Sequence, residues 1–270
     1  TITVEPTSGL AAINLRELWH YRDLLFFLVW RDISVRYKQT VLGAVWVILQ
    51  PFLTMVIFTF IFGKLANLPS EGVPYPIFFF SALLPWQYFS STLNSSANSL
   101  VNNANLISKV YFPRLLIPLS SLCPTLVDFA ISFLVLLGLL FFYGFGLTWN
   151  ALWLPAFMLL LMTTVLGIGL WFSALNIHYR DIRYIVPFIT QFGMFVSPVV
   201  YPSSVLPERW RAVYAANPMV GVIEGFRWAV LGKAALPGRE IVISTAVALL
   251  LLLGGLFYFR RAEKHFADIV

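Results

Sequence analysis

Charged residues are scarce in this sequence. Asp, Glu, Lys and Arg supply 11% of its 270 residues, against about 25% in a typical soluble domain. Hydrophobic residues supply 59%, and the mean hydropathy is +0.82. This composition cannot build a surface that dissolves in water, so we predict an integral membrane protein. The net charge of +6 is compatible with nucleic-acid binding. However, the basic residues lie between apolar runs, as loop charges of membrane proteins do. We therefore expect no nucleic-acid partner.

Motifs for catalysis and metal binding are also missing. The one cysteine, Cys123, excludes an intrachain disulfide, and the histidines His20, His178 and His265 lie too far apart in sequence for a Cys/His metal motif. No Gly-x-x-x-x-Gly-Lys-Ser/Thr phosphate loop, nucleophile elbow or His-Glu-x-x-His motif occurs. We therefore predict no catalytic residue, metal or cofactor in this chain. The energy for any active work must come from another protein.

Long apolar runs predict the fold. A helix needs about 20 apolar residues to cross a bilayer, and this sequence has six such candidate runs, of which the fifth is short and contains Pro187. We predict an all-α integral membrane protein with six transmembrane helices. It forms one domain, 1–270, whose membrane-spanning core is 40–260. The expected spans are 40–63, 76–99, 114–142, 151–176, 183–200 and 241–259.

The stretch between the fifth and sixth runs predicts a re-entrant helix. Asn217-Pro218 is typical of a helix start, with an N-cap followed by proline, and Gly232 is typical of a helix end. The enclosed helix, 218–231, is about 21 Å long, shorter than a hydrocarbon core of about 30 Å. We expect it to enter the membrane without crossing it. A short buried helix with no role in a transport path is the alternative.

Basic residues predict the orientation. Six crossings place both termini on one side, together with most of the 18 Lys and Arg residues. The positive-inside rule assigns that side to the cytoplasm. The residues concerned are Arg16, Arg22, Arg31, Arg36, Lys38, Lys109, Arg114, Arg180, Arg183, Arg260, Arg261 and Lys264.

Residues 14–38 predict an amphipathic helix in the cytoplasmic membrane interface. Asn14 and Glu17 have the spacing of a capping box, and apolar residues recur mainly on one face. Packing of the same helix on a partner protein is an alternative compatible with this position. The apolar residues are Leu15, Leu18, Leu25, Phe26, Val29 and Ile33.

Three charged residues lie in segments expected to enter the membrane. Asp128 is about 21 Å along its helix from Arg114, near the membrane middle. An intramembrane acid is a functional candidate; alternatively, Thr125 or a neighbouring helix satisfies it. Glu224 and Arg227 are three residues apart on the re-entrant helix, so they can pair. They form either a structural ion pair or part of a seal at the outer mouth.

Asparagines and deep aromatic residues are candidates for contact with a polar substrate. Four asparagines of the second span recur at spacings of four, four and three, which places them on one helical face. They line a hydrated path or bond to a neighbouring helix. Tryptophan and tyrosine inside a span need partners for their polar atoms, which a sugar chain supplies; core packing is the alternative. The residues are Asn94, Asn98, Asn102 and Asn105, with Trp46, Trp86 and Tyr88.

Several blocks of this sequence, taken together, resemble ABC-2-type permeases that export polysaccharides. They occur in the family's order over about 30–230, nearly the whole chain. The blocks are Arg36-Tyr37-Lys38-Gln39-Thr40-Val41-Leu42-Gly43-Ala44-Val45-Trp46 with Gln50-Pro51; Lys109-Val110-Tyr111-Phe112-Pro113-Arg114 with Pro118-Leu119; Asn176-Ile177-His178-Tyr179-Arg180-Asp181-Ile182-Arg183; Ser197-Pro198-Val199 with Tyr201-Pro202; and Asn217-Pro218 through Glu224-Gly225-Phe226-Arg227.

The resemblance implies partners, substrate and roles. It implies six spanning helices, an N-terminal interface helix and periplasmic re-entrant helices between spans five and six. It also implies a homodimer in the bacterial cytoplasmic (inner) membrane, with two copies of a separate ATPase subunit that binds ATP and Mg. The substrate is a lipid-linked polysaccharide such as O-antigen, capsule or teichoic acid, with O-antigen the first choice. By position it implies a substrate channel at Trp46, Trp86, Tyr88, Phe89, Asn94 and Asn98; ATPase coupling at Asn105, Lys109, Tyr111, Arg114, Arg180 and Asp181; and an outer gate at Glu224 and Arg227.

Other function classes predict other features. A membrane glycosyl or acyl transferase acting on a lipid-linked sugar predicts clustered acids or histidines at one membrane face, and here they are scattered. An ABC-2 exporter of lipids or drugs is not expected to carry the blocks above. An ion channel predicts an acidic or carbonyl-rich filter. We therefore expect a transport permease that is not itself an enzyme.

Overall fold

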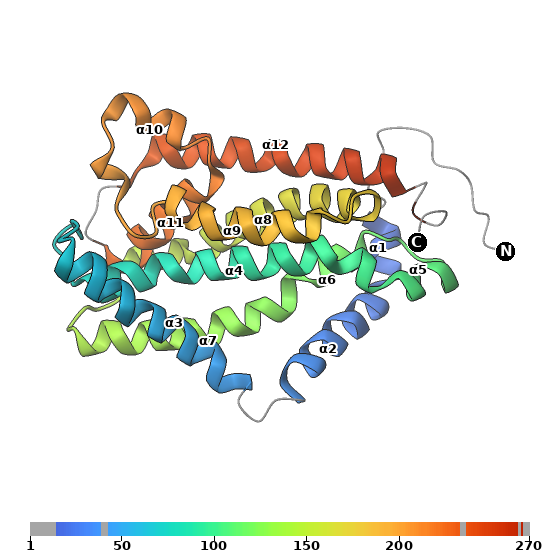
Figure 1. Ribbon diagram of the computed structural model, residues 1–270, viewed down its shortest axis with the longest axis horizontal. Helices are drawn as coiled ribbons and strands as arrows, with labels where there is room; N and C mark the ends of the chain where they lie inside the picture. Colours follow the sequence, from blue (N-terminus) through green and yellow to red (C-terminus); the bar gives the residue numbers. More distant parts are fainter. Residues whose placement is uncertain (1–14, 39–42, 233–235, 264–265, 267–270) are drawn as a thin grey trace.

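The computed structural model describes residues 15–38, 43–232, 236–263 and 266, and every regular element in these ranges is a helix. This confirms the all-α fold class. Figure 1 shows the long helices side by side, with α5 (Ala104–Lys109) at one end of the bundle and α10 (Glu208–Tyr214) at the other. We refer to these as the α5 end and the α10 end.

Four helical segments in the described part of the chain are long and apolar enough to cross a membrane. They coincide with the first, third, fourth and sixth predicted spans. The segments are Val45–Leu65, made of α3 (Gly43–Phe58) and the π-helix η1 (Thr59–Leu65); Leu116–Phe142, made of α6 (Leu116–Ser120) and α7 (Leu122–Phe142); Trp149–His178, made of the 3-10 helix η2 (Trp149–Trp153) and α8 (Leu154–His178); and α12 (Gly238–Glu263).

The second and fifth predicted spans are helices of a different kind. α4 (Tyr75–Asn102) has 28 residues, enough for about 42 Å, but its serines and asparagines make it more polar than the four segments above. α9 (Ile182–Val196) has 15 residues, enough for about 22 Å. The crossing of the membrane by these two helices, and so the total of six, stays a prediction.

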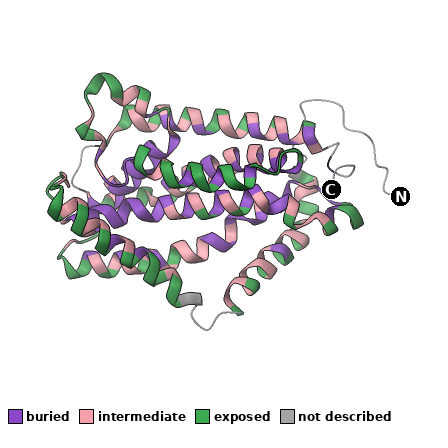
Figure 2. Ribbon diagram, in the orientation of Figure 1, coloured by how far each residue is buried: buried purple, intermediate pink, exposed green. Residues whose placement is uncertain are grey.

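α4 lies at the centre of the bundle. Every residue from Ile77 to Trp86 is buried, and the helix contacts α3, α7, α8 and α9. Figure 2 shows buried residues concentrated on α4 and on α11 (Pro218–Leu231). Because other helices enclose α4, its polar side chains can bond to protein and need not face lipid. This position explains how the second predicted span can contain serines and asparagines.

α11 begins and ends as its sequence predicts. The Asn217 side chain accepts a hydrogen bond from the Met219 N–H (3.1 Å), Pro218 occupies the first turn, and Gly232 stops the helix with φ 66°. All α11 residues except Trp228 are buried. α11 is thus a short buried helix packed between α4, α8 and α12; its entry into a membrane stays a prediction.

α8 and α12 pack so closely that their backbones touch. A Cβ at Gly167 would lie 2.7 Å from the Leu252 nitrogen, and a Cβ at Gly255 would lie 2.5 Å from the Gly167 carbonyl oxygen. Glycine is therefore required at both positions. Nearer the α10 end, Ser244 of α12 accepts a hydrogen bond from the Gly221 N–H (3.0 Å). α12 thus joins α8 and holds the first half of α11 in place.

The expected interface helix is two helices, α1 (Leu15–His20) and α2 (Arg22–Lys38). The predicted cap, Asn14, lies outside the described residues. Val29 is half-buried, as a single apolar face predicts, but Phe26 is 70% exposed. The prediction of one apolar face is therefore wrong for α2, because large apolar side chains also lie on its exposed side. These are Phe26, Phe27, Trp30 and Val35.

An apolar cluster holds the α5 end together. Leu28 of α2, Phe112 of the loop after α5 and Phe259 of α12 are buried in it. Phe266 is also buried there, with its ring centroid 5.4 Å from that of Phe259. Three parts of the chain that are distant in sequence therefore share one core at this end.

Candidate functional site

A buried ion pair lies on α11. Arg227 Nη1 is 3.3 Å from Glu224 Oε1, and the two side chains are 2% and 8% exposed. The pairing predicted from their spacing is confirmed. Removing a charge from water costs several kcal/mol, so both groups need partners beyond each other.

Backbone groups and an aromatic ring supply these partners. Arg227 Nη2 donates to the Pro198 carbonyl (2.9 Å), and the guanidinium carbon lies 3.8 Å from the centroid of the Phe78 ring. Glu224 Oε1 accepts a hydrogen bond from the Ser203 N–H (2.8 Å). The pair therefore ties α11 to α4 and to the segment after α9. The spacing of the two residues in sequence predicts none of these further contacts.

A cavity of about 530 Å³ lies beside this pair. It is open to solvent on one side and is bounded by α10, α11, the start of α12 and the 3-10 helix η3 (Ser203–Val205). The buried Glu224 and Arg227 line it together with the half-buried Trp228, and Arg239 is exposed at its rim. Its volume falls within the roughly 300–1,000 Å³ typical of small-molecule sites. Sequence reasoning missed the cavity because its walls come from separate parts of the chain.

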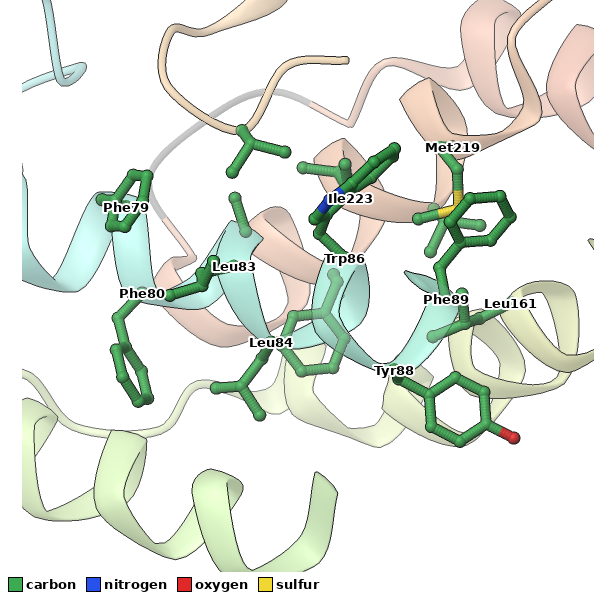
Figure 3. Close-up of a cluster of buried hydrophobic side chains, with 14 of the residues drawn as sticks. Phe79, Phe80, Leu83, Leu84, Trp86, Tyr88, Phe89, Leu161, Met219 and Ile223 are labelled. Carbon is green, nitrogen blue, oxygen red and sulfur yellow. The ribbon is translucent and has the colours of Figure 1, made fainter. Parts of the chain in front are cut away.

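Three predicted channel aromatics are buried inside the chain (Figure 3). Trp86, Tyr88 and Phe89 are 5%, 3% and 5% exposed. The rings of Trp86 and Phe89 lie 5.2 Å apart, and the Tyr88 hydroxyl donates to the Leu122 carbonyl (3.1 Å). Core packing, the alternative to channel lining, accounts for these positions. A channel role for the three residues stays a prediction.

Trp46, the remaining predicted channel aromatic, is 54% exposed. It lies on α3; Figure 2 shows exposed residues along α3 and α9, and many of these are large apolar side chains. The rings of Phe58 and Phe195 lie 6.4 Å apart, so α3 and α9 meet near the α10 end. Apolar surface of this extent marks contact with lipid or with another protein. The exposed side chains include Trp46, Phe52, Leu53 and Ile57 of α3, and Tyr184, Phe188, Phe192 and Phe195 of α9.

The asparagine stripe of α4 is partly bonded to protein. Asn94 and Asn98 are half-buried, and each donates to a carbonyl one turn earlier in α4, at 2.8 and 2.9 Å. Asn176 of α8 donates to Asn98 Oδ1 (3.2 Å). The predicted bond to a neighbouring helix is therefore confirmed for Asn98, whereas Asn102 and Asn105 are exposed at the α5 end. A hydrated path along the stripe stays a prediction.

Asp128 is bonded to the last turn of α2. Arg36 Nη1 lies 2.7 Å from Asp128 Oδ2, and the Tyr37 hydroxyl donates to Oδ1 (2.5 Å). Thr125, one partner considered from the sequence, shares a hydrogen bond with Thr92 of α4 instead (2.5 Å). Burial raises the pKa of Tyr37, and the hydrogen bond to Asp128 raises it further. The alternative of an acid satisfied by a neighbouring helix is confirmed, and that helix is α2.

Five predicted ATPase-coupling residues are exposed. Asn105 and Lys109 lie on α5 and Tyr111 follows it, while Arg180 and Asp181 lie in the turn between α8 and α9. Figure 1 shows both segments at the α5 end. Exposed side chains from two segments at one end of a bundle form a surface to which another protein can bind.

Arg114, the sixth predicted coupling residue, has partners inside the chain. Its backbone N–H donates to Glu263 Oε1 (3.1 Å), and its guanidinium donates to the Glu263 backbone carbonyl. The guanidinium also lies 5.9 Å from the centroid of the Phe266 ring. Glu263 also pairs with Arg260 (3.1 Å). Arg114 therefore holds the loop after α5 against the end of α12. Contact between Arg114 and an ATPase stays a prediction.

Comparison with known protein families decides among the transport and enzyme classes. Residues 23–231 match the family described as ABC-2 type transporter. The chain belongs to this family. The match includes every block of residues that carries the resemblance, which is thereby confirmed. Membership in a transporter family also confirms a transport permease over a membrane-bound transferase.

Relatives of this ABC-2 family chain match it over nearly their full length. It is 31% identical to the O-antigen export system permease protein RfbA of Myxococcus xanthus, over 95% of this chain and 98% of the relative. It is 30% identical to a Klebsiella pneumoniae protein of the same name, over 92% and 95%. The polysialic acid transport protein KpsM of Escherichia coli is 28% identical, over 87% and 91%.

Proposed function

We propose that this chain is the transmembrane subunit of an ABC transporter that exports a lipid-linked polysaccharide, O-antigen in the first place, across the bacterial cytoplasmic membrane. The observation that carries the proposal is the similarity to an O-antigen export permease over 95% of the chain. Membership in the ABC-2 family supports it. The four long apolar helices support its place in a membrane.

In this proposal α4 and α9 complete six crossings, and both termini are cytoplasmic. The exposed basic residues Lys109, Arg180 and Arg183 support a cytoplasmic α5 end. The α10 end is then periplasmic. α11, with 14 residues and about 21 Å of length, is a re-entrant helix on that side.

The exporting channel forms between two copies of this chain. The exposed apolar faces of α3 and α9 support this part of the proposal. Beside a polar channel these faces would contact water, and a second copy of the chain covers them. Trp46 lies on one of these faces, so it lines the channel near the dimer contact. Cross-linking of a Phe192→Cys variant in a Cys123→Ala background tests the contact, and Leu250→Cys on the exposed side of α12 is the matched control.

Two copies of a separate ATPase subunit bind the α5 end and hold ATP and Mg. The exposed Lys109, Tyr111, Arg180 and Asp181 support this docking surface. Tyrosine and arginine are enriched at protein interfaces, and charged groups such as Lys109 and Asp181 suit the polar rim of an interface.

Deletion of the gene in its host tests the proposed function. The deletion strain is expected to lose surface polysaccharide and to accumulate lipid-linked polymer inside the cell, and a plasmid copy restores the surface polymer. The tagged chain is expected to purify together with an ATPase subunit and to hydrolyse no ATP once that subunit is removed. A deletion strain with unchanged surface polysaccharide contradicts the proposal.

A capsule polymer is the second candidate substrate, because the chain is 28% identical to a polysialic acid transport protein. The same deletion strain separates the two. Loss of the O-antigen ladder from extracted lipopolysaccharide supports O-antigen export. An intact ladder with loss of capsule supports capsule export.

A further inference from the structure

The charged residues that line the cavity at the α10 end are balanced in sign. A phosphate site gathers guanidinium and ammonium groups in excess, and a cation site gathers carboxylates in excess. This cavity has equal numbers of carboxylates and guanidiniums, so it favours neither ion. Hydroxyl groups both donate and accept hydrogen bonds, so they match a mixed lining. The charged residues are Glu71, Glu224, Glu240, Arg211, Arg227 and Arg239.

Trp228 adds an aromatic surface to this lining. It is the one α11 residue that is not buried, and it lines the cavity. The Phe157 ring packs edge-on against it, with centroids 6.5 Å apart and planes at 79°, so the indole is held in one orientation. An indole offers an apolar face with a polar edge. A sugar ring has the same two-sided character, with C–H groups on its face and hydroxyls at its edge.

We propose that this cavity binds a short neutral segment of the exported glycan, with Trp228 stacked on a sugar ring and Glu224 and Glu240 accepting hydrogen bonds from its hydroxyls. Its volume of about 530 Å³ is large enough for such a segment. The inference rests on the proposed export of a polysaccharide. It places a binding site for the leaving polymer directly against the Glu224–Arg227 pair.

Saturation-transfer difference NMR tests the site on the purified permease in nanodiscs prepared without sugar-headed detergent. The probes are maltotriose and mannotriose as neutral sugars, sialyllactose as an anionic sugar, and inorganic phosphate as a competitor. We expect saturation transfer to at least one neutral trisaccharide. Trp228→Leu keeps apolar volume against Phe157 but removes the aromatic face, so it is expected to lower the affinity about tenfold. Trp149→Leu, at an 87% exposed tryptophan of η2 outside the cavity, is the matched control and leaves the affinity unchanged.

Three results overturn the inference. They are no transfer to either neutral trisaccharide at millimolar concentration, an equal loss in the two tryptophan variants, and displacement of the sugar by phosphate. Glu240→Gln on the cavity wall removes a hydrogen-bond acceptor without touching Phe157, and it is expected to weaken binding even if Trp228→Leu fails to fold. A permease that exports polymer but binds no sugar overturns this inference alone, whereas the proposed function fails only if the deletion strain keeps its surface polymer.

Discussion

Arg36 Nη1 lies 2.7 Å from Asp128 Oδ2, so the last turn of α2 is joined by an ion pair to α7. The two side chains are 37% and 21% exposed. Lipid around such a pair screens charge much less than water does. The pair therefore sets where the chain leaves α2, just before the first apolar span.

Asp128→Asn is expected to destabilise the protein by about 1–3 kcal/mol, because it removes the carboxylate charge that pairs with Arg36 and accepts the Tyr37 hydrogen bond. Thermal unfolding in nanodiscs measures the change. Asp23→Asn is the control, because the Asp23 side chain is 93% exposed and its Oδ1 lies 3.9 Å from Arg22 Nε, a longer distance than that between Arg36 and Asp128. Exchange of the two residues, Arg36→Asp with Asp128→Arg, is expected to recover part of the loss. Equal melting temperatures for Asp128→Asn and Asp23→Asn would show that the pair contributes nothing.

Glu224→Gln is expected to destabilise the protein by about 3–5 kcal/mol, because Arg227 is then buried without a counter-charge. The double change Glu224→Met with Arg227→Met is expected to cost less than either single change, since apolar residues of similar size often replace a buried pair at little cost. Chemical or thermal unfolding of Glu224→Met, Arg227→Met and the double variant measures this difference, and the same experiment on Glu224→Gln measures the first.

The same double variant tests the outer-gate role of the pair. If Glu224 and Arg227 form a gate, the folded Met/Met variant is expected to export polymer more slowly or to leak small solutes. Folded protein with normal export and no leak restricts the pair to a structural role.

Trp86→Ala and Trp46→Ala are expected to fail in different ways. Trp86 is 5% exposed, so its truncation leaves a cavity and is expected to cost about 3–5 kcal/mol. Trp46 is 54% exposed, so its truncation is expected to cost little stability and to reduce export if it lines the channel. Membrane abundance measured with surface polymer separates the two effects. Normal export by well-folded Trp46→Ala contradicts a channel role.

Arg114 and Glu263 are joined by two separate hydrogen bonds, each between a side chain and a backbone group. Arg114→Ala and Glu263→Ala are each expected to cost about 1–3 kcal/mol in thermal unfolding, because each change removes one of these bonds. Lys109→Ala, at an exposed residue of α5, is expected to keep full stability and to weaken only the binding of the ATPase subunit. Unchanged stability of both the Arg114 and the Glu263 variant would show that the loop after α5 is not held by these bonds.

Properties that depend on composition or on residues close in the chain were determined by the sequence alone. The membrane class followed from 11% charged residues, because lipid accepts a surface that water does not. The start of α11 at Asn217 and its end at Gly232 followed from capping, which acts within one turn. The Glu224–Arg227 pair followed from their spacing on one helix.

Contacts between distant segments were decided only by the tertiary structure. Arg36 meets Asp128, and Arg114 meets Glu263, because all the helices pack together and bring these positions into reach. No local rule relates such residues. For the same reason apolar character alone did not separate Trp86, buried in α4 at the centre of the bundle, from Trp46, exposed on α3. The cavity beside α11 likewise exists only after α10, α11, η3 and the start of α12 have packed around it.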